Sequence, residues 1–298
     1  RGLDPVTAVQ IATINAAEFF KVDDELGSIA NGKIADLLIV NNLSDFEVET
    51  VVADGEVVSR KGSFKADLKP PKYPEYMKDT IKLPREIRPN DFKVKTEKDN
   101  EVKVKVIGVI EGELITKKEN AVLPLENGCI CADVDKDISK ISVIERHQSP
   151  EYQEFADNDF LMGTGFINGF GLNDGAIGES FAPVPENIAV VGSNDEDMAK
   201  VVNHIQEVGG GLVVVKNGEI LSQLKLPILG LLSRNSLEKV SKKQKETVAA
   251  TKKIGCEIRS PFLTLMFMTY PIIPELKITE FGLVDVENME TVNLEYDD

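Results

Sequence analysis

The sequence has few of the residues that build metal centres and disulfide frameworks. Its 298 residues include 2 histidines, 3 cysteines and no tryptophan. Neither histidine belongs to an H-x-H or H-E-x-x-H motif, so a self-sufficient zinc site is not expected. The cysteines are Cys129, Cys131 and Cys256. An odd and sparse set of this kind favours reduced thiols in a cytoplasmic protein over a disulfide framework.

Basic charge and long apolar runs are also scarce. The chain carries 50 acidic and 34 basic residues, a formal net charge of −16, which opposes binding to nucleic acid and to anionic membranes. The longest apolar stretch, residues 263–273, is interrupted by Pro271 and is too short to span a bilayer. The first residues have neither the basic nor the apolar region of a secretory signal. We therefore expect a globular, cytoplasmic protein with no nucleic-acid or membrane partner.

Glycine is concentrated in residues 165–192, which read GFINGFGLNDGAIGESFAPVPENIAVVG. Four of its glycines lie close together: Gly169, Gly171, Gly175 and Gly178. Each would cost about 0.5–1 kcal/mol in a regular element, so neither a helix nor a well-packed strand is expected there. Two interpretations stay open: a loop that carries binding groups into a strand at 188–191, or tight turns between strands of an ordinary sheet. The G-x-G-x-x-x-G spacing is one residue too long for a dinucleotide fingerprint.

Apolar residues at helical spacing predict three helices. The first begins with a cap and a proline and covers residues 4–21. The second covers residues 195–208, with Asn194 as its cap, an acidic first turn and Gly209 after its end. The third covers residues 237–254 and has a basic outer face, which is typical of a solvated surface.

Strand patterns lie on both sides of a proline-rich segment. Residues 35–40 form an almost entirely apolar run, and residues 51–58 read as a hairpin around an Asp-Gly turn. Residues 64–89 then combine several prolines and charges with little periodicity, which indicates a linker and a domain boundary near residues 84–89. Residues 91–144 predict several further strands.

The two histidines differ in their settings. His204 lies at the edge of the apolar stripe of the second helix, where a packing or surface role is the more ordinary one. His147 follows the strand-like run 141–144 and begins a polar loop, which is a better position for a working residue. No serine or cysteine has the sequence context of an activated nucleophile.

Several long blocks of the sequence occur in the order typical of one enzyme family. ATINAAEFF, LGSIANGKIADLLIV and VVADGEVV resemble the segment that leaves the metal-binding barrel of the amidohydrolase superfamily and completes its small β-sandwich. The later blocks are VIERH, GFINGFGLNDGAIGES, NIAVVGSNDEDMAKVVNHIQEVGGGLVVVKNGE, LPILGLLS and FLTLMFMTYPIIPELKITEFGLVDV. These resemble the C-terminal domain of bacterial-type adenine deaminases. The resemblance covers nearly the whole chain and is weakest in residues 64–91.

The resemblance implies an α+β fold, in which a remnant of the amidohydrolase β-sandwich precedes a mixed α/β C-terminal domain. The catalytic (β/α)8 barrel is then largely absent from this chain. The implied domains are the last barrel helix and exit segment at 1–26, sandwich strands at 27–64, a linker at 65–89 and the adenine-deaminase-type C-terminal domain at 90–298. Strands without their sandwich partners would expose apolar surface and sheet edge, so we expect this chain to self-associate when it is produced alone.

The same resemblance implies a hydrolase of purine salvage that converts adenine to hypoxanthine and ammonia. Its water is activated on a divalent metal, manganese or iron, held by the barrel, and none of the metal ligands lies in this chain. The implied partners are the N-terminal barrel portion of the same protein, a purine base as substrate, and further copies in a homo-oligomer. The chain by itself is expected to be inactive.

One segment departs from the family. Where the family has A-H-D-S-H-N after the glycine-rich stretch, this chain has APVPEN at residues 182–187, so only the first and last positions match. The candidate catalytic residues are Glu186, whose carboxylate could bind or move a proton in place of an imidazole, and His147. Asn187 is the candidate substrate-binding residue. The alternative is a diverged, non-catalytic relative that acts as a binding or assembly module.

Overall fold

The computed structural model describes residues 2–65, 71–99, 101–150, 155, 160–183 and 186–296. The chain forms two compact units, Arg1–Pro71 and Lys72–Asp298. The fold is α+β, as predicted, and most of its regular structure is sheet. In the described parts of the chain, no helix is both long and apolar enough to cross a membrane.

The first unit begins with two short helices, α1 (Pro5–Ala12) and α2 (Ile14–Phe20). Asp4 caps α1 as predicted, because its carboxylate accepts a hydrogen bond from the Thr7 backbone N–H at 3.0 Å. The prediction of one continuous helix is wrong. Thr13 leaves the helical region, with φ −125° and ψ −94°, and its hydroxyl donates to the Val9 carbonyl at 2.6 Å. A threonine bonded back in this way competes with regular helix geometry.

Four antiparallel strands complete the first unit. Their order is β1 (Leu37–Val40), β2 (Val48–Ala53), β3 (Glu56–Arg60) and β4 (Ser63–Phe64). The predicted hairpin is confirmed, since β2 and β3 are joined by Asp54 and Gly55, both with positive φ, at 51° and 81°. Two consecutive positive values suit the tight turns that match the twist of a hairpin.

A mixed sheet of eight strands organises the second unit. Its spatial order is β15-β14-β12-β13-β10-β11-β6-β7, and every neighbouring pair is antiparallel except β6 and β11. The strands are β6 (Val102–Val109), β7 (Thr116–Leu123), β10 (Ile138–Ile144), β11 (Met162–Asn168), β12 (Ala176–Ala182), β13 (Asn187–Gly192), β14 (Gly211–Lys216) and β15 (Glu219–Lys225).

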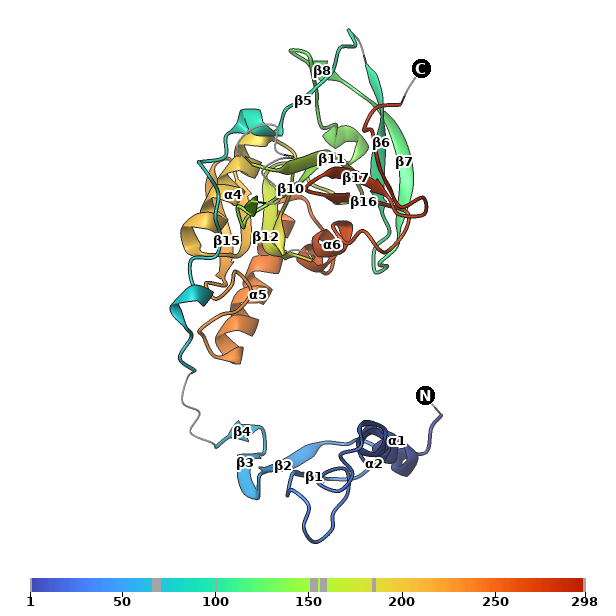
Figure 1. Cartoon of the computed structure of the whole chain (residues 1–298), viewed down its shortest axis with the longest axis vertical. Coiled ribbons are helices and arrows are strands. Elements are labelled where there is room, and N and C mark those ends of the chain that lie inside the picture. The colour runs from blue at the N-terminus through green and yellow to red at the C-terminus, as the bar shows by residue number, and fades with distance from the viewer. Residues whose placement is uncertain are drawn as a thin grey trace. The chain divides into compact units, whose positions relative to one another are not determined.

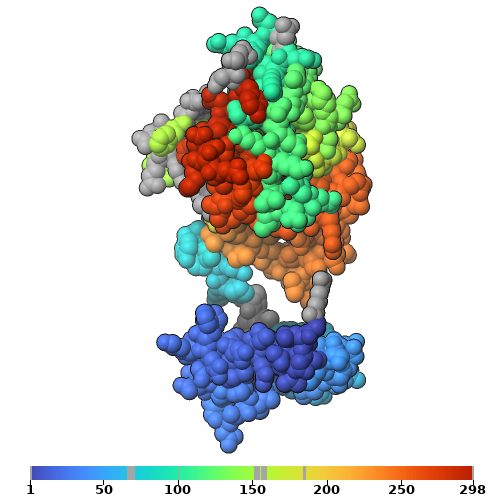
Figure 2. Space-filling model, turned by 90° about the vertical axis from the view of Figure 1, so that its right-hand side faces the viewer, coloured from blue at the N-terminus to red at the C-terminus, as the bar shows by residue number. Residues whose placement is uncertain are grey.

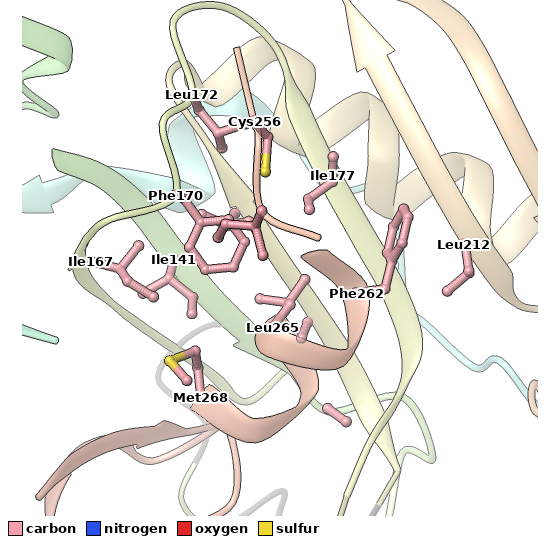
Figure 3. Close-up of a cluster of buried hydrophobic side chains, with 14 of the residues drawn as sticks. Ile141, Ile167, Phe170, Leu172, Ile177, Leu212, Cys256, Phe262, Leu265 and Met268 are labelled. Carbon is pink, nitrogen blue, oxygen red and sulfur yellow. The ribbon is translucent and has the colours of Figure 1, made fainter. Parts of the chain in front are cut away.

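Helices cover both faces of this sheet (Figure 1). Helix α4 (Asp195–Val208) packs on one face, against β12, β13 and β14. The other face carries α5 (Leu237–Thr251), α6 (Pro261–Met268) and the small sheet β16 (Leu276–Thr279), β17 (Gly282–Asp285) and β18 (Glu290–Val292). Figure 3 shows Phe262, Leu265 and Met268 of α6 pointing toward the apolar side chains of the sheet.

Short elements complete the second unit. The three-stranded sheet β5-β9-β8 consists of β5 (Val94–Lys95), β8 (Leu125–Glu126) and β9 (Cys129–Ile130). Single turns of 3-10 helix are η1 (Glu75–Met77), η2 (Pro89–Phe92), η3 (Val134–Lys136) and η4 (Lys252–Ile254). Near the end of the chain, the Leu294 carbonyl accepts from the Lys105 N–H at 2.8 Å. Figure 2 shows these last residues (red) against β6 and β7 (green).

The proline-rich segment differs from the predicted linker. The two units divide between Pro71 and Lys72, whereas the sequence placed a boundary near residues 84–89. The reason is that three apolar side chains of this segment, and Phe92 just after it, are buried in one cluster with side chains of α4: Ile81, Leu83, Ile87 and Phe92. Asn203 of α4 fixes the segment by bonding both backbone groups of Ile87, at 2.9 and 2.8 Å.

The glycine-rich stretch forms strands and tight turns of the central sheet, which is the second of the two interpretations. The prediction that none of its glycines suits a packed strand is wrong for Gly178, which lies within β12. A Cβ at this position would come within 2.5 Å of Val201 on α4 and 2.9 Å of the Ala189 carbonyl. Glycine is therefore required here for close packing of helix on sheet.

The second and third predicted helices are confirmed. The Asn194 side chain accepts from the Asp197 N–H at 2.8 Å, and Gly209 ends α4 with φ 78°. Helix α5 is followed by η4, and Gly255 with φ 96° closes the pair. His204 has the predicted packing role, because it is buried and its ring nitrogens contact Glu207 at 2.9 Å and Gln223 at 2.8 Å.

Candidate functional site

The predicted site residues meet at one end of the central sheet. His147 follows β10, Glu186 precedes β13, and Asn187 is the first residue of β13. Strands β10 and β13 are antiparallel neighbours, so the end of one lies beside the start of the other. Val184 and Pro185, which belong to the diverged segment, lie outside the described residues.

Glu145 shapes the loop that carries His147. Its side chain is 4% exposed. One carboxylate oxygen accepts from the His147 backbone N–H at 2.6 Å, and the other accepts from the Gln148 N–H at 2.9 Å. Both oxygens are thus used to hold the turn, and the His147 side chain is exposed at its tip. The backbone after β10 is therefore held in place by Glu145, and the imidazole of His147 extends from it.

Arg146 holds the Glu186 segment from the other side of the strand. Its guanidinium is 1% exposed and donates to the carbonyls of Glu186 and Leu229, the latter at 2.9 Å. Burial lowers the pKa of Arg146 to about 10, an effect that Glu186 and Glu145 oppose. Gly230 makes room for this cation, since a Cβ there would lie 2.1 Å from Nη1. Arg146 is therefore a positioning residue for the backbone at 186.

Glu186 and Asn187 are adjacent but differ in exposure. Glu186 has a positive φ of 60° and an exposed side chain. Asn187 is 1% exposed, and neither its amide oxygen nor its amide nitrogen meets hydrogen-bond geometry with any partner in the described part of the chain. A buried side chain of this kind is uncommon, because an unmade hydrogen bond in the interior is costly.

Glu179 of β12 is a member of this site that the sequence analysis did not single out. It is fully buried, and no described residue gives either carboxylate oxygen a hydrogen-bond partner. Burial raises the pKa of this carboxyl well above its ordinary value of 4.5, which favours the neutral acid in comparison with an exposed glutamate. The signal in the sequence was a single charged residue inside the strand AIGESFA.

Strand register places these groups on one face of the sheet. Glu179 pairs with Ala189, two residues after Asn187, so Glu179 and Asn187 are diagonal neighbours on the same face. Ile144 pairs with Ile188 on the opposite face, which brings Glu145 and Asn187 side by side on this one. The face is the one covered by α6 and β16.

Glu280 approaches the same group from the turn between β16 and β17. Its side chain is 5% exposed, and burial raises its pKa, while Asn187 and His147 lower it and Glu145 raises it further. The turn comes close because Gly163 of β11 has no side chain: a Cβ there would lie 2.1 Å from the Thr279 carbonyl. Glu280 was also missed, since nothing in TEFG distinguishes it from an ordinary turn.

The arrangement suits hydrogen bonding and proton transfer better than metal binding. No group of three or more His, Cys, Asp or Glu side chains among the described residues is arranged to hold a metal ion. The cysteines are free thiols: Cys129 lies on β9, and Cys131 and Cys256 lie in loops. What the site offers is three buried acids, a buried amide and, at Glu186 and His147, exposed groups that can exchange protons with a ligand.

Comparison with known proteins identifies the family of this chain. Residues 113–290, more than half of the chain, match the model of the adenine deaminase C-terminal domain, and residues 1–58 match that of the amidohydrolase family. An adenine deaminase of Mesorhizobium japonicum is 38% identical over 99% of this chain and 47% of its own length. One of Dehalococcoides mccartyi is 37% identical over 98% of this chain and 48% of its own length.

A third relative gives the same result. An adenine deaminase of Clostridium botulinum is 35% identical over 98% of this chain and 47% of its own length. The chain therefore spans about half the length of the curated relatives that it matches. The family resemblance seen in the sequence is confirmed, and the chain belongs to the adenine deaminase C-terminal domain family.

Proposed function

We propose that this chain is the C-terminal part of an aminohydrolase that converts adenine and water to hypoxanthine and ammonia. The observation that carries the proposal is similarity to adenine deaminases over 98–99% of the chain at 35–38% identity. A non-catalytic binding or assembly module is less well supported, because the relatives that cover the chain are named as enzymes.

The reaction divides between this chain and the rest of the protein. A divalent metal, manganese or iron, would supply a water of lowered pKa as the nucleophile, and the described residues of this chain do not fit such a metal. We assign to this chain the tasks of holding the purine and moving protons. Asn187 offers hydrogen bonds to the base, while Glu186 or His147 delivers the proton that lets the exocyclic amine leave as ammonia.

The first unit supports the proposal that an N-terminal barrel portion packs against it. In its described residues only Ala17 and Thr50 are buried, and Phe19 and Phe20 are 81% and 70% exposed. A cavity of about 620 Å³ lies between its helices and strands and is lined mainly by apolar side chains. Exposed apolar surface of this extent marks an interaction face.

Other assignments remain part of the same proposal. Residues 1–26 would be the last barrel helix and exit segment, and residues 27–64 the strands that complete a β-sandwich. We propose a cytoplasmic homo-oligomer that acts in purine salvage. For this chain produced alone, the same apolar surface predicts self-association, and a monodisperse monomer in sedimentation at micromolar concentration would contradict that prediction.

Ammonia and hypoxanthine release by the full-length protein tests the proposed activity. We expect turnover of adenine with manganese supplied, and a loss of kcat of about a hundredfold or more in Glu186→Gln, because the amide cannot transfer a proton. Loss in His147→Gln with an active Glu186→Gln would assign the proton transfer to His147 instead. A parent protein that binds stoichiometric metal but turns over no aminopurine would overturn the proposal.

A further inference from the structure

Two buried polar side chains on one sheet face have no partner within the described residues. They are Glu179, which is fully buried, and Asn187, which is 1% exposed. Together they leave four polar atoms without hydrogen bonds, both oxygens of the acid and both amide atoms. Interiors seldom tolerate this, so such groups call for a ligand or an ordered water that completes their bonding.

The neighbours of these two side chains do not provide that bonding. Ile177 and Ala189, beside Glu179 on the same face, are apolar and fully buried. Glu145 lies next to Asn187 in the register, but its two oxygens already accept the N–H groups of His147 and Gln148. The Asn187 side chain is close enough to Glu280 to lower the pKa of that carboxyl as a hydrogen-bonding neighbour, but the pair does not meet the distance and angle requirements of a hydrogen bond.

The charge state of the site restricts the class of ligand. Burial raises the pKa of Glu179, and no neighbouring cation opposes the effect. A neutral carboxyl carries one O–H donor beside one C=O acceptor, and a carboxamide carries an N–H donor beside a C=O acceptor. Each of the two side chains therefore presents one hydrogen-bond donor beside one acceptor. Each can pair with a planar ligand edge that has an acceptor next to a donor.

Nucleobases carry edges of this type. Asparagine binds adenine through a bidentate pair to N6 and N7, with the amide as donor to the ring nitrogen and acceptor from the amine. A protonated carboxyl has the same donor and acceptor arrangement and suits a second edge of the same ring. A cationic ligand would instead favour an ionised acid, and a metal ion would require more ligands than the described residues bring together.

We infer that Glu179 and Asn187 form a recognition site for the edges of a neutral aminopurine, with Glu179 acting as a protonated donor and acceptor. The inference rests on the proposed function for the identity of the ligand and adds the residues and protonation state that select it. Glu179 is a specificity-determining residue in this account, because a ring edge without an adjacent donor and acceptor would leave the buried carboxyl unpaired.

Equilibrium binding of adenine and hypoxanthine to the full-length protein tests this assignment. Glu179→Gln keeps a neutral donor and acceptor fork, whereas Glu179→Met keeps the volume and removes both groups. We expect the adenine Kd of Glu179→Gln to stay within about threefold of the parent, and that of Glu179→Met to rise about tenfold to a hundredfold. Asn187→Leu should weaken binding to a similar extent.

A matched control separates recognition from folding. Thr247 lies on α5 and is fully buried, and its hydroxyl is hydrogen-bonded to that of Ser222 on β15 at 3.0 Å. Thr247→Val therefore removes a buried polar group away from the candidate site. We expect adenine binding by Thr247→Val to equal that of the parent. If it weakens as much as Glu179→Met, or if Glu179→Met binds like the parent, the inference is overturned.

The outcome also distinguishes this inference from the proposed function. Suppose that the parent binds adenine, that Glu179→Met weakens this binding and Glu179→Gln does not, but that no ammonia is released. This result would support the recognition site and refute the proposed deaminase activity. A parent that deaminates adenine while Glu179→Met keeps its KM would leave the deaminase standing and refute the site. If Glu179→Gln and Glu179→Met weaken adenine binding equally, Glu179 does not bind the base as a neutral donor and acceptor.

Discussion

The two units of this chain use their apolar residues in opposite ways. The second unit buries them in three clusters around an eight-stranded sheet and in addition buries polar groups such as Glu179 and Asn187. The first unit leaves most of its large apolar side chains exposed around four strands and two short helices. The difference indicates that the second unit is stabilised by its own core, whereas the first leaves an apolar surface of the kind that the proposed N-terminal portion would cover.

The largest effect expected from this comparison is the response to loss of a phenyl ring. Phe166 in β11 is fully buried, so Phe166→Ala should destabilise the second unit by about 3–5 kcal/mol. Phe20→Ala in the first unit removes a ring from a residue that is 70% exposed. It should change the free energy of unfolding of the first unit by no more than about 0.5 kcal/mol. Urea unfolding followed by circular dichroism measures both. Similar effects of the two substitutions would remove the distinction between the units.

A smaller effect tests the close packing of the second unit. Gly178→Ala should cost about 1–3 kcal/mol, because the new methyl group meets Val201 and the Ala189 carbonyl. The double substitution with Val201→Ala should recover part of the loss by opening space on α4. If Gly178→Ala is neutral in the same unfolding experiment, the helix is not held as tightly as we describe.

The last effect concerns the charge of Glu179, and it is absent at low pH. Its pKa in the folded protein is raised by burial, so the folded chain keeps a proton that the unfolded chain loses above about pH 4.3. Stability that is fully present below this pH is then lost as pH rises toward the folded pKa. Glutamine does not titrate, so the stability of Glu179→Gln relative to the parent should increase by up to about 1.4 kcal/mol per pH unit in this window.

The control for this prediction is the pH dependence of Thr247→Val, which should run parallel to that of the parent, since no titrating group is changed. A constant difference between Glu179→Gln and the parent from pH 5 to pH 8 would mean that Glu179 titrates alike in the folded and unfolded chains. It would also contradict the neutral acid on which the ligand site depends.

The sequence was most informative where local chemistry determines structure. The Asn194 cap and the Gly209 stop fix the ends of α4, and the Asp54-Gly55 pair fixes a hairpin, because each acts through its own backbone and near neighbours. It was less informative for Gly178, which depends on a helix that follows it in the chain, and for residues 81–92, whose apolar side chains find their core on α4.

The candidate site shows the same limit. His147, Glu186 and Asn187 could be proposed from a strand end and a diverged motif, and the structure brings them to one end of the sheet. Glu179 and Glu280 come from a strand and a turn with no motif of their own, and they join the site only through register and through the approach permitted by Gly163. Pairings between distant segments decide which polar groups meet.

The most direct test of the account is ammonia release from adenine by the full-length protein compared with a version that ends at Pro71. The truncated protein would keep everything that precedes the second unit, including the expected metal ligands. We predict that it binds the same amount of metal but loses at least about a hundredfold in kcat/KM, because the groups that hold the base and move the proton are gone. Full activity of the truncated protein would show that the second unit holds no part of the site.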